Sequence, residues 1–360
     1  MKGALLLALA LLTGCSGSSQ PVALPTPTPT ASPSPVTTQP LATRTPVATT
    51  ASPTVGPVGT KVPKGFAPTS ATFISDRTGW VLGASPCPSG KGSCDVIART
   101  RDGGATWRAI PSPATTPEHL AQVRFADERN GYVTGDQLWA THDGGATWKV
   151  VPGVEDVTQL AAAAGRVWVT DNQELTSAPV GGGAFVTEMG DVTAFVLNRD
   201  LVVYTSSRAE LKLYAAKHGG NGADAVEVPC AQADGPVLGL GSTSHWFLVC
   251  EGDAGLGHQD KEAFESFDAG TTWKRAGKPP PLTGTDIYVT SDGDFVIDHQ
   301  EVAVYRGGTW KVALTTDGGL SEGGFESARL GFCIGGFDGA PDLRMKLTQD
   351  AGRTWSTVTF

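Results

Sequence analysis

Apolar and polar residues alternate along short stretches of the chain, which is the pattern of β-strands with one buried face. Between residues 122 and 151 there are four such stretches, each bounded by a polar turn: 122–125, 131–134, 138–141 and 149–151. The third and fourth stretches flank a turn with the sequence Thr-His-Asp-Gly-Gly-Ala-Thr-Trp. The pattern therefore predicts a unit of four short antiparallel strands joined by tight turns.

The turn between the third and fourth predicted strands recurs along the chain. The pattern Ser/Thr-x-Asp-x-Gly-x-Thr-Trp, the signature turn, occupies 100–107, 141–148, 266–273 and 348–355. A short Asp carboxylate can accept hydrogen bonds from the following backbone N–H groups, and Gly adopts a positive φ without steric cost. We therefore interpret its aspartates and tryptophans as structural. They are Asp102, Trp107, Asp143, Trp148, Asp268, Trp273, Asp350 and Trp355.

The spacing of these tryptophans sets the number of units. Trp107 and Trp148 are 41 residues apart, and the 125 residues from Trp148 to Trp273 are three steps of about 42 residues, a period of four-stranded propeller blades. A weakened copy ending at Trp310 has Tyr305 where the aspartate belongs. Six steps separate the first copy from the last. The sequence therefore predicts an all-β fold, a seven-bladed β-propeller of four-stranded blades.

A second motif opens three of the units. It reads Phe73-x5-Gly79, Phe125-x5-Gly131 and Phe325-x5-Gly331. In the third unit, Gly182 and Phe185 stand where the signature Gly and Trp would fall, and the fourth retains only Val226 near the Trp position. The expected propeller covers 69–360, with blades at 69–113, 118–154, 157–190, 191–230, 233–281, 282–316 and 317–360.

With both motifs, residues 69–360 resemble propellers with Asp-box repeats of the bacterial neuraminidase type and, more closely, the photosystem II stability/assembly factor-like propellers. The closer resemblance implies a non-enzymatic scaffold that binds or assembles proteins. The sialidase side implies the alternative, a glycan-binding or glycoside-hydrolysing propeller. A sialidase also needs an arginine triad and a Tyr nucleophile with a Glu partner, and the chain shows neither pattern. No catalytic residue and no cofactor is therefore predicted.

The N-terminus has the features of an export signal. An apolar run at 3–12 precedes Leu12-Thr13-Gly14-Cys15, which resembles a bacterial lipoprotein signal, so that 1–14 would be cleaved and Cys15 lipidated. The run is shorter than the ~20 residues needed to span a bilayer. An ordinary secretory signal is the alternative. The lipoprotein interpretation places the protein at the extracytoplasmic face of the cell membrane, with the membrane as a partner through the lipid.

Residues 15–68 are predicted to be a disordered linker, because Pro, Thr, Ser, Ala and Val dominate and aromatics are almost absent. Alternating prolines favour extended polyproline II. An O-glycosylated stalk and a passive spacer both remain open.

The formal net charge of -9 argues against nucleic acid as a partner, and we expect a monomeric body. Two short polar segments, His258-Gln-Asp260 and Asp292-Gly-Asp294, each offer too few ligands for a metal site. They are interpreted as solvated turns, and no metal is predicted.

Five cysteines remain besides Cys15, and an exported protein favours disulfides. Cys87 and Cys94 flank one loop and are expected to pair. Cys230 and Cys250 would end strands at the same face, which allows a second bridge. Cys333 is then interpreted as a small buried apolar residue.

The loops between second and third strands would lie on the face opposite the signature turns, and three are long: 83–95, 251–263 and 335–342. Blade six has only a tight turn at 299–300, so its neighbours would surround a low area. We hypothesise that an envelope protein or a glycan docks there. The alternative is that these loops have no binding role. The residues expected near the contact are Lys91, His258, Lys261, His299, Asp338 and Arg344.

Overall fold

A computed structural model of the protein describes residues 56–113, 122–171, 173–198, 201–206, 212–218, 223–230, 235–255, 258–281, 284–340 and 342–360. The predicted signal peptide, Cys15 and the linker as far as residue 55 lie outside the described residues. Every regular element in the described ranges is a β-strand. Over the same ranges no helix is long and apolar enough to cross a membrane.

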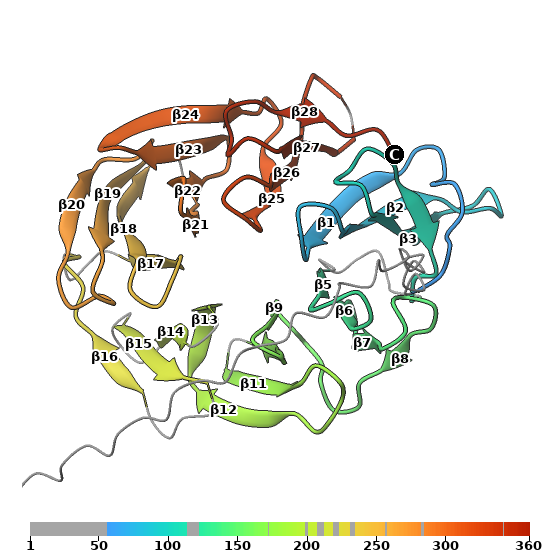
Figure 1. Ribbon diagram of the computed structural model, residues 1–360, viewed down its shortest axis with the longest axis horizontal. Coiled ribbons are helices and arrows are strands. Elements are labelled where there is room, and N and C mark those ends of the chain that lie inside the picture. Colours follow the sequence, from blue (N-terminus) through green and yellow to red (C-terminus); the bar gives the residue numbers. More distant parts are fainter. Residues whose placement is uncertain are drawn as a thin grey trace, which may run out of the picture. The chain divides into compact units, whose positions relative to one another are not determined.

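Seven four-stranded sheets follow one another around a ring (Figure 1), and each consists of four consecutive antiparallel strands. The predicted seven-bladed propeller is therefore confirmed. Blade one contains β1 (Ala67–Phe73), β2 (Gly79–Pro86), β3 (Ser93–Thr100) and β4 (Arg108–Ile110); blade two contains β5 (Val123–Phe125), β6 (Gly131–Thr134), β7 (Leu138–Thr141) and β8 (Lys149–Val150); blade three contains β9 (Gln159–Ala163), β10 (Arg166–Thr170), β11 (Glu174–Pro179) and β12 (Val186–Gly190). Blade four contains β13 (Val192–Leu197), β14 (Leu201–Ser206), β15 (Lys212–Lys217) and β16 (Asp224–Val226); blade five contains β17 (Gly235–Leu240), β18 (Trp246–Gly255), β19 (His258–Ser266) and β20 (Lys274–Gly277). Blade six contains β21 (Asp286–Thr290), β22 (Gly293–Ile297), β23 (Glu301–Arg306) and β24 (Thr309–Thr315); blade seven contains β25 (Leu320–Phe325), β26 (Gly331–Gly335), β27 (Arg344–Thr348) and β28 (Ser356–Thr357).

The signature turns are closed by their own side chains. Asp143 Oδ1 accepts from Thr141 Oγ1 at 2.8 Å and from the Thr147 backbone N–H at 2.9 Å, while Oδ2 accepts from Thr147 Oγ1 at 2.6 Å. Desolvation opposes ionisation, but the hydrogen bonds from Thr147 and Thr141 lower the pKa of Asp143 to about 2. The other three signature turns have the same contacts. These are the contacts of a turn-forming carboxylate.

The opening motif and the signature turn meet in one packing unit. The ring of Phe125 lies against Gly131, where an added Cβ would be 2.5 Å from a ring carbon. The same ring stacks on Trp80 of blade one at 3.8 Å between centroids and meets Trp148 edge-on at 6.1 Å. Blade seven repeats this arrangement around Phe325. The two motifs therefore occur together because the phenylalanine ring of the opening motif packs on both the glycine of that motif and the tryptophan of the signature turn. The same ring also contacts the preceding blade.

Three tryptophans at the signature position, Trp148, Trp273 and Trp310, also bond to the preceding blade. The indole N–H of Trp148 donates a hydrogen bond of 2.9 Å to the Pro111 carbonyl. The indole N–H of Trp310 donates one of 2.8 Å to the Ala276 carbonyl. Trp310 thus keeps its link to blade five although Tyr305 has replaced the aspartate of its turn. This link to the neighbouring blade does not need the signature aspartate, so the Trp can remain when the Asp is lost.

Side chains close the ring between blades seven and one. In the described part of the chain no sheet shares a strand with another blade. Instead Phe73 faces Phe332 at 6.1 Å, and the C-terminal Phe360 packs against Phe66 at 4.7 Å and Trp107 at 5.1 Å. Closure therefore depends on aromatic packing rather than on a shared backbone ladder.

The last residues of the predicted linker, 56–66, pack on the propeller. Thr60 exchanges two backbone hydrogen bonds of 2.8 Å with Ala109 on β4. Val62 is 3% exposed and lies in the core cluster that blades one and seven share. Of the predicted linker 15–68, residues 56–66 are therefore part of the folded body, because strand pairing and one buried valine hold them.

Both expected disulfides are present. Cys87–Cys94 closes the β2–β3 hairpin, and Cys230–Cys250 joins the end of blade four to β18 of blade five. Cys333 is free and fully buried, and burial raises the pKa of its thiol. It therefore occupies the core as a small apolar residue.

Candidate functional site

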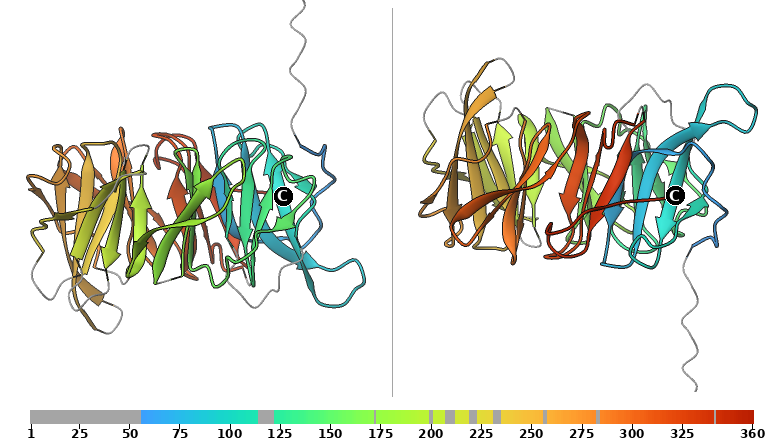
Figure 2. Two further views of the ribbon diagram at one scale, coloured as in Figure 1. Left: turned by 90° about the horizontal axis from the view of Figure 1, so that it is seen from below. Right: turned by 90° about the horizontal axis from the view of Figure 1, so that it is seen from above.

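The face opposite the signature turns carries the loops between second and third strands. Figure 2 shows the β2–β3 and β18–β19 hairpins extending from the same side of the ring. Blade six is short here, because β22 and β23 are joined by a tight turn around His299 and Gln300. We call this side the loop face.

A cavity of about 300 Å³ opens on the loop face at blades six and seven, and we call it the channel-mouth pocket. Its lining combines carboxylates, hydroxyls and one imidazole from the starts of β21 and β25 and the end of β22. These are Thr285, Asp286, Asp298, His299, Ser321 and Glu322. Asp286, Ser321 and Glu322 also line a cavity of about 460 Å³ in the central channel. The pocket is therefore continuous with the channel.

The tight turn of blade six fixes the rim of the pocket. Asp298 Oδ1 accepts hydrogen bonds from the backbone N–H groups of Gln300 at 2.9 Å and Glu301 at 2.8 Å. The His299 carbonyl accepts from the Leu320 N–H at 2.7 Å, and the imidazole lies over Gly319, where a Cβ would be 2.8 Å from the ring. The predicted contact residue His299 is thus held at the pocket rim, tied to blade seven.

Arg124 of β5 lines the central channel and, alongside β1, reaches and neutralises one carboxylate of the pocket. Its guanidinium lies 2.9 Å from Glu322 Oε1 and also donates to Ser70 Oγ at 3.2 Å. Burial opposes the charged form, but the adjacent Glu322 raises the pKa of Arg124 overall. Burial raises the pKa of Glu322 in turn. This ion pair connects blades two and seven through the channel.

Asp286 differs from the other acidic groups of the pocket. Asp298 accepts hydrogen bonds from the backbone of its own turn, and Glu322 forms an ion pair with Arg124. For Asp286, in contrast, the structure shows no hydrogen bond or ion pair with any described residue. Water reaches its side chain in the channel, while the surrounding strands and the charge of Glu251 raise its pKa. The carboxylate therefore lines the pocket without an ion-paired protein cation, and the charge of Arg124 offsets the rise of its pKa only in part.

Glu326 predicts a pH dependence of stability. Its side chain is exposed to the water of the central channel, but the inner strands around it desolvate the carboxylate and raise its pKa to about 7. Between pH ~4.3 and 7 the folded state then binds more protons than the unfolded state, so this group makes stability fall as pH rises. Glu326→Gln should remove that fall, measured as the free energy of unfolding by denaturant at pH 5 and pH 8. Identical pH slopes for the wild type and the variant would contradict this assignment.

The predicted contact residues do not form one surface. Lys91 is exposed in the β2–β3 loop, while Asp338 and Arg344 are exposed in blade seven and form an ion pair at 3.8 Å. His258 begins β19, but its side chain is outside the described ones. Only His299 lines the channel-mouth pocket.

Lys261 was wrongly predicted as a surface contact. The segment 251–263 is mostly strand rather than loop, because β18 extends to Gly255 and β19 starts at His258. Strand alternation turns Lys261 toward blade six, where it is 3% exposed and its Nζ donates to the Gly284 carbonyl at 2.9 Å. Burial lowers its pKa. Lys261 therefore links blades five and six beneath the pocket.

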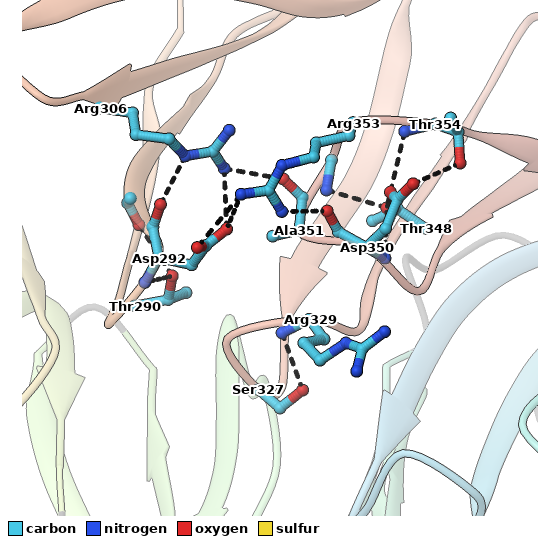
Figure 3. Close-up of polar contacts among 12 residues, drawn as sticks. Thr290, Asp292, Arg306, Ser327, Arg329, Thr348, Asp350, Ala351, Arg353 and Thr354 are labelled. Carbon is cyan, nitrogen blue, oxygen red and sulfur yellow. Dashed lines mark hydrogen bonds and ion pairs between the residues drawn. The ribbon is translucent and has the colours of Figure 1, made fainter.

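Asp292 is also more than a solvated turn residue. Figure 3 shows its carboxylate between two guanidinium groups, Arg306 at 3.2 Å and Arg353 at 3.0 Å. Arg306 also donates to the Ala351 carbonyl at 2.9 Å. No spacing in the sequence indicates this tie between blades six and seven, because Asp292 and Arg353 meet only in the folded ring.

Comparison with known proteins establishes the fold. No protein-family model and no curated protein matches the chain. Among solved structures, YCF48 bound to a D1 peptide is similar with 16% identity and a TM-score of 0.54, over 81% of this chain and 95% of that one. YCF48 from Cyanidioschyzon merolae has 14% identity and a TM-score of 0.53, over 81% and 98%.

The propeller domain of the Trilobed protease from Pyrococcus furiosus has 7% identity and a TM-score of 0.59, over 83% of this chain and 97% of that one. That domain is described as having an open velcro topology. Identities this low show the fold alone. The chain is a seven-bladed β-propeller whose structural neighbours include the photosystem II assembly factor YCF48.

Proposed function

We propose that this protein is a non-enzymatic propeller that binds a polypeptide segment of another envelope protein at the channel-mouth pocket. In this proposal the lipid on Cys15 holds it at the extracytoplasmic face of the cell membrane. The supporting observation is the pocket itself, about 300 Å³ in volume, with the unpartnered carboxylate of Asp286 in its wall. A similar fold bound to a D1 peptide supports a polypeptide as the ligand class.

The charges of the pocket indicate the chemistry of that segment. Arg124 already compensates Glu322, and backbone N–H groups stabilise Asp298, so Asp286 is the carboxylate available to a ligand. A Lys or Arg side chain of the partner, or a free amino group, would form an ion pair with this carboxylate, because opposite charges across an interface favour binding and specificity. The proposed partner therefore presents a basic residue to the channel mouth.

Two labelled peptides of equal length, one with Lys and Arg and one with Glu at the same positions, test this proposal by fluorescence anisotropy. We expect the basic peptide to bind about tenfold more tightly at low salt, and Asp286→Asn to abolish the difference. Asp136→Asn is the matched control, because Asp136 is an exposed carboxylate on the loop face of blade two. Equal affinities for both peptides, or equal effects of both substitutions, would refute the proposed site.

The natural partner can be captured on cells. A photo-crosslinking residue at Ser321, in the pocket, should trap a protein that the same residue at Ala146, in the signature turn of blade two, does not. Identical capture from both positions would place the partner elsewhere.

The glycan alternative has one observation in its favour. Glu326 and Asp286 are channel carboxyl groups with raised pKa values, and glycoside hydrolysis uses an acid kept protonated near neutral pH. A panel of fluorogenic glycosides separates the two functions. Turnover that Glu326→Gln abolishes would overturn the non-enzymatic proposal, whereas we expect no turnover.

A further inference from the structure

Three ligand-type side chains converge on the face of the signature turns, at the boundary of blades five and six. His245 precedes β18, Glu265 lies near the end of β19, and Asp294 lies near the start of β22. His245 Nε2 is 3.5 Å from Glu265 Oε1 and 3.6 Å from Asp294 Oδ1, and one ligand atom from each residue lies within 4.8 Å of the others. This cluster is separate from the channel-mouth pocket, which opens on the loop face.

The fold holds each of the three residues by its backbone. The His245 N–H donates to Ser242 Oγ at 2.9 Å, and its carbonyl accepts from the Gly241 N–H at 3.0 Å. Glu265 and Asp294 are strand residues, paired in register with Phe247 and Tyr305 respectively. The exposed ring of Phe267 stacks on the imidazole at 4.7 Å between centroids with an interplanar angle of 10°. The ligand atoms are therefore positioned by rigid elements before any ion binds.

The contacts within the cluster do not satisfy its polar atoms. Asp294 is 3% exposed, and neither its Oδ1 nor His245 Nε2 has a hydrogen-bond partner in the described chain. Separations of 3.5 and 3.6 Å exceed an ordinary N–H···O bond, and one Nε2–H can donate well to only one carboxylate. Even a protonated imidazole gives the cluster one positive charge for two carboxylates, with Lys274 acting on Glu265 from outside the cluster, and a buried charge without compensation is costly. The buried Oδ1 of Asp294 thus lies close to the imidazole of His245 and the carboxylate of Glu265 without a hydrogen-bond partner.

The geometry of the cluster suits a metal ion. A tetrahedral ion with bonds of ~2.0–2.2 Å to nitrogen and oxygen has ligand atoms about 3.3–3.6 Å apart. The two distances from His245 Nε2 are within this range. Imidazole together with carboxylates is typical of Zn²⁺ and its first-row neighbours, whereas Mg²⁺ and Ca²⁺ prefer oxygen ligands alone.

We propose that His245, Glu265 and Asp294 bind one divalent transition-metal ion of the Zn²⁺ class, with a water molecule as the fourth ligand, and that this ion ties blade five to blade six. The tie includes blade six, in which Tyr305 replaces the signature aspartate and pairs with Asp294 across the two strands. Tyr305 packs in the same interblade core as Phe247. The site is independent of any partner at the channel mouth.

Calorimetric titration of EDTA-treated protein, dialysed free of chelator, with Zn²⁺ tests the proposal. One-to-one binding is expected, weakened at least about 100-fold in His245→Gln and in Asp294→Asn. His142→Gln, an exposed histidine in blade two, should bind as the wild type does. Loaded with Co²⁺, the wild type should show the intense visible absorption of a four-coordinate ion, and Asp294→Asn should not.

Thermal melting separates loss of the site from loss of the fold. In EDTA, Asp294→Asn should melt at or above the wild-type temperature, because the substitution removes repulsion between two carboxylates. Added Zn²⁺ should raise the melting temperature of the wild type only. Absence of Zn²⁺ binding by the wild type, or undiminished binding by both variants, would overturn the proposal.

Discussion

Replacing Phe125 with alanine should lower the free energy of unfolding by about 3–5 kcal/mol. The ring is 3% exposed, stacks on Trp80 of the preceding blade and supports Trp148 of its own signature turn. Its removal leaves a cavity between two blades and exposes the Gly131 backbone that the ring covers. Denaturant unfolding at constant pH measures the loss.

Two further variants distinguish ring stacking from simple volume. Phe125→Leu retains apolar contact without the stacked ring and should lose less than the alanine variant. Val312→Ala, at a side chain that is 49% exposed, should change stability by under about 0.5 kcal/mol. An alanine variant at position 125 as stable as Val312→Ala would show that the opening motif does not join the blades.

Val62→Asp should also destabilise the protein severely, by about 3 kcal/mol or more. Val62 is 3% exposed in the cluster where blades one and seven meet, so an aspartate there buries a charge among apolar side chains. Four residues earlier, Val58 is 90% exposed, and Val58→Asp is the matched control that should melt as the wild type does. Equal melting of the two variants would mean that the segment 56–66 adds nothing to ring closure.

The sequence predicts the blades well because the residues that define them are close together. Thr141, Asp143 and Thr147 bond within one turn, and Phe125 covers a glycine six positions later. Such short-range contacts leave a repeated pattern. The segment 56–66 leaves none, because its fixed position depends on Thr60 pairing with Ala109 and on a single valine entering a distant core. The surrounding sequence is rich in proline and predicts neither the strand pairing nor the buried valine.

The candidate sites depend on contacts across the ring and are harder to predict. Arg124 and Glu322 form their ion pair from blades two and seven, and no spacing in the sequence indicates that they meet. Likewise, His245 and Asp294 belong to adjacent blades, so no metal-binding motif of fixed spacing marks them. Lys261 shows the opposite difficulty. Its position in an apparently long loop, 251–263, suggests exposure, whereas β18 continues through 251–255 and β19 already begins at His258, and Lys261 is buried as a strand residue.

The closure of the ring bears on how the chain can be rearranged. Each sheet is one uninterrupted stretch of sequence, and Phe66 and Phe360 are in contact at the seam between blades seven and one. A circular permutant that joins residue 360 to the segment before Phe66 and opens the chain between two other blades would therefore cut no sheet. In propellers whose last blade borrows a strand from the other end of the chain, that blade fixes where the termini must lie. Here the beginning of the fold is set by the order of synthesis, and the architecture itself would accept any blade as the first.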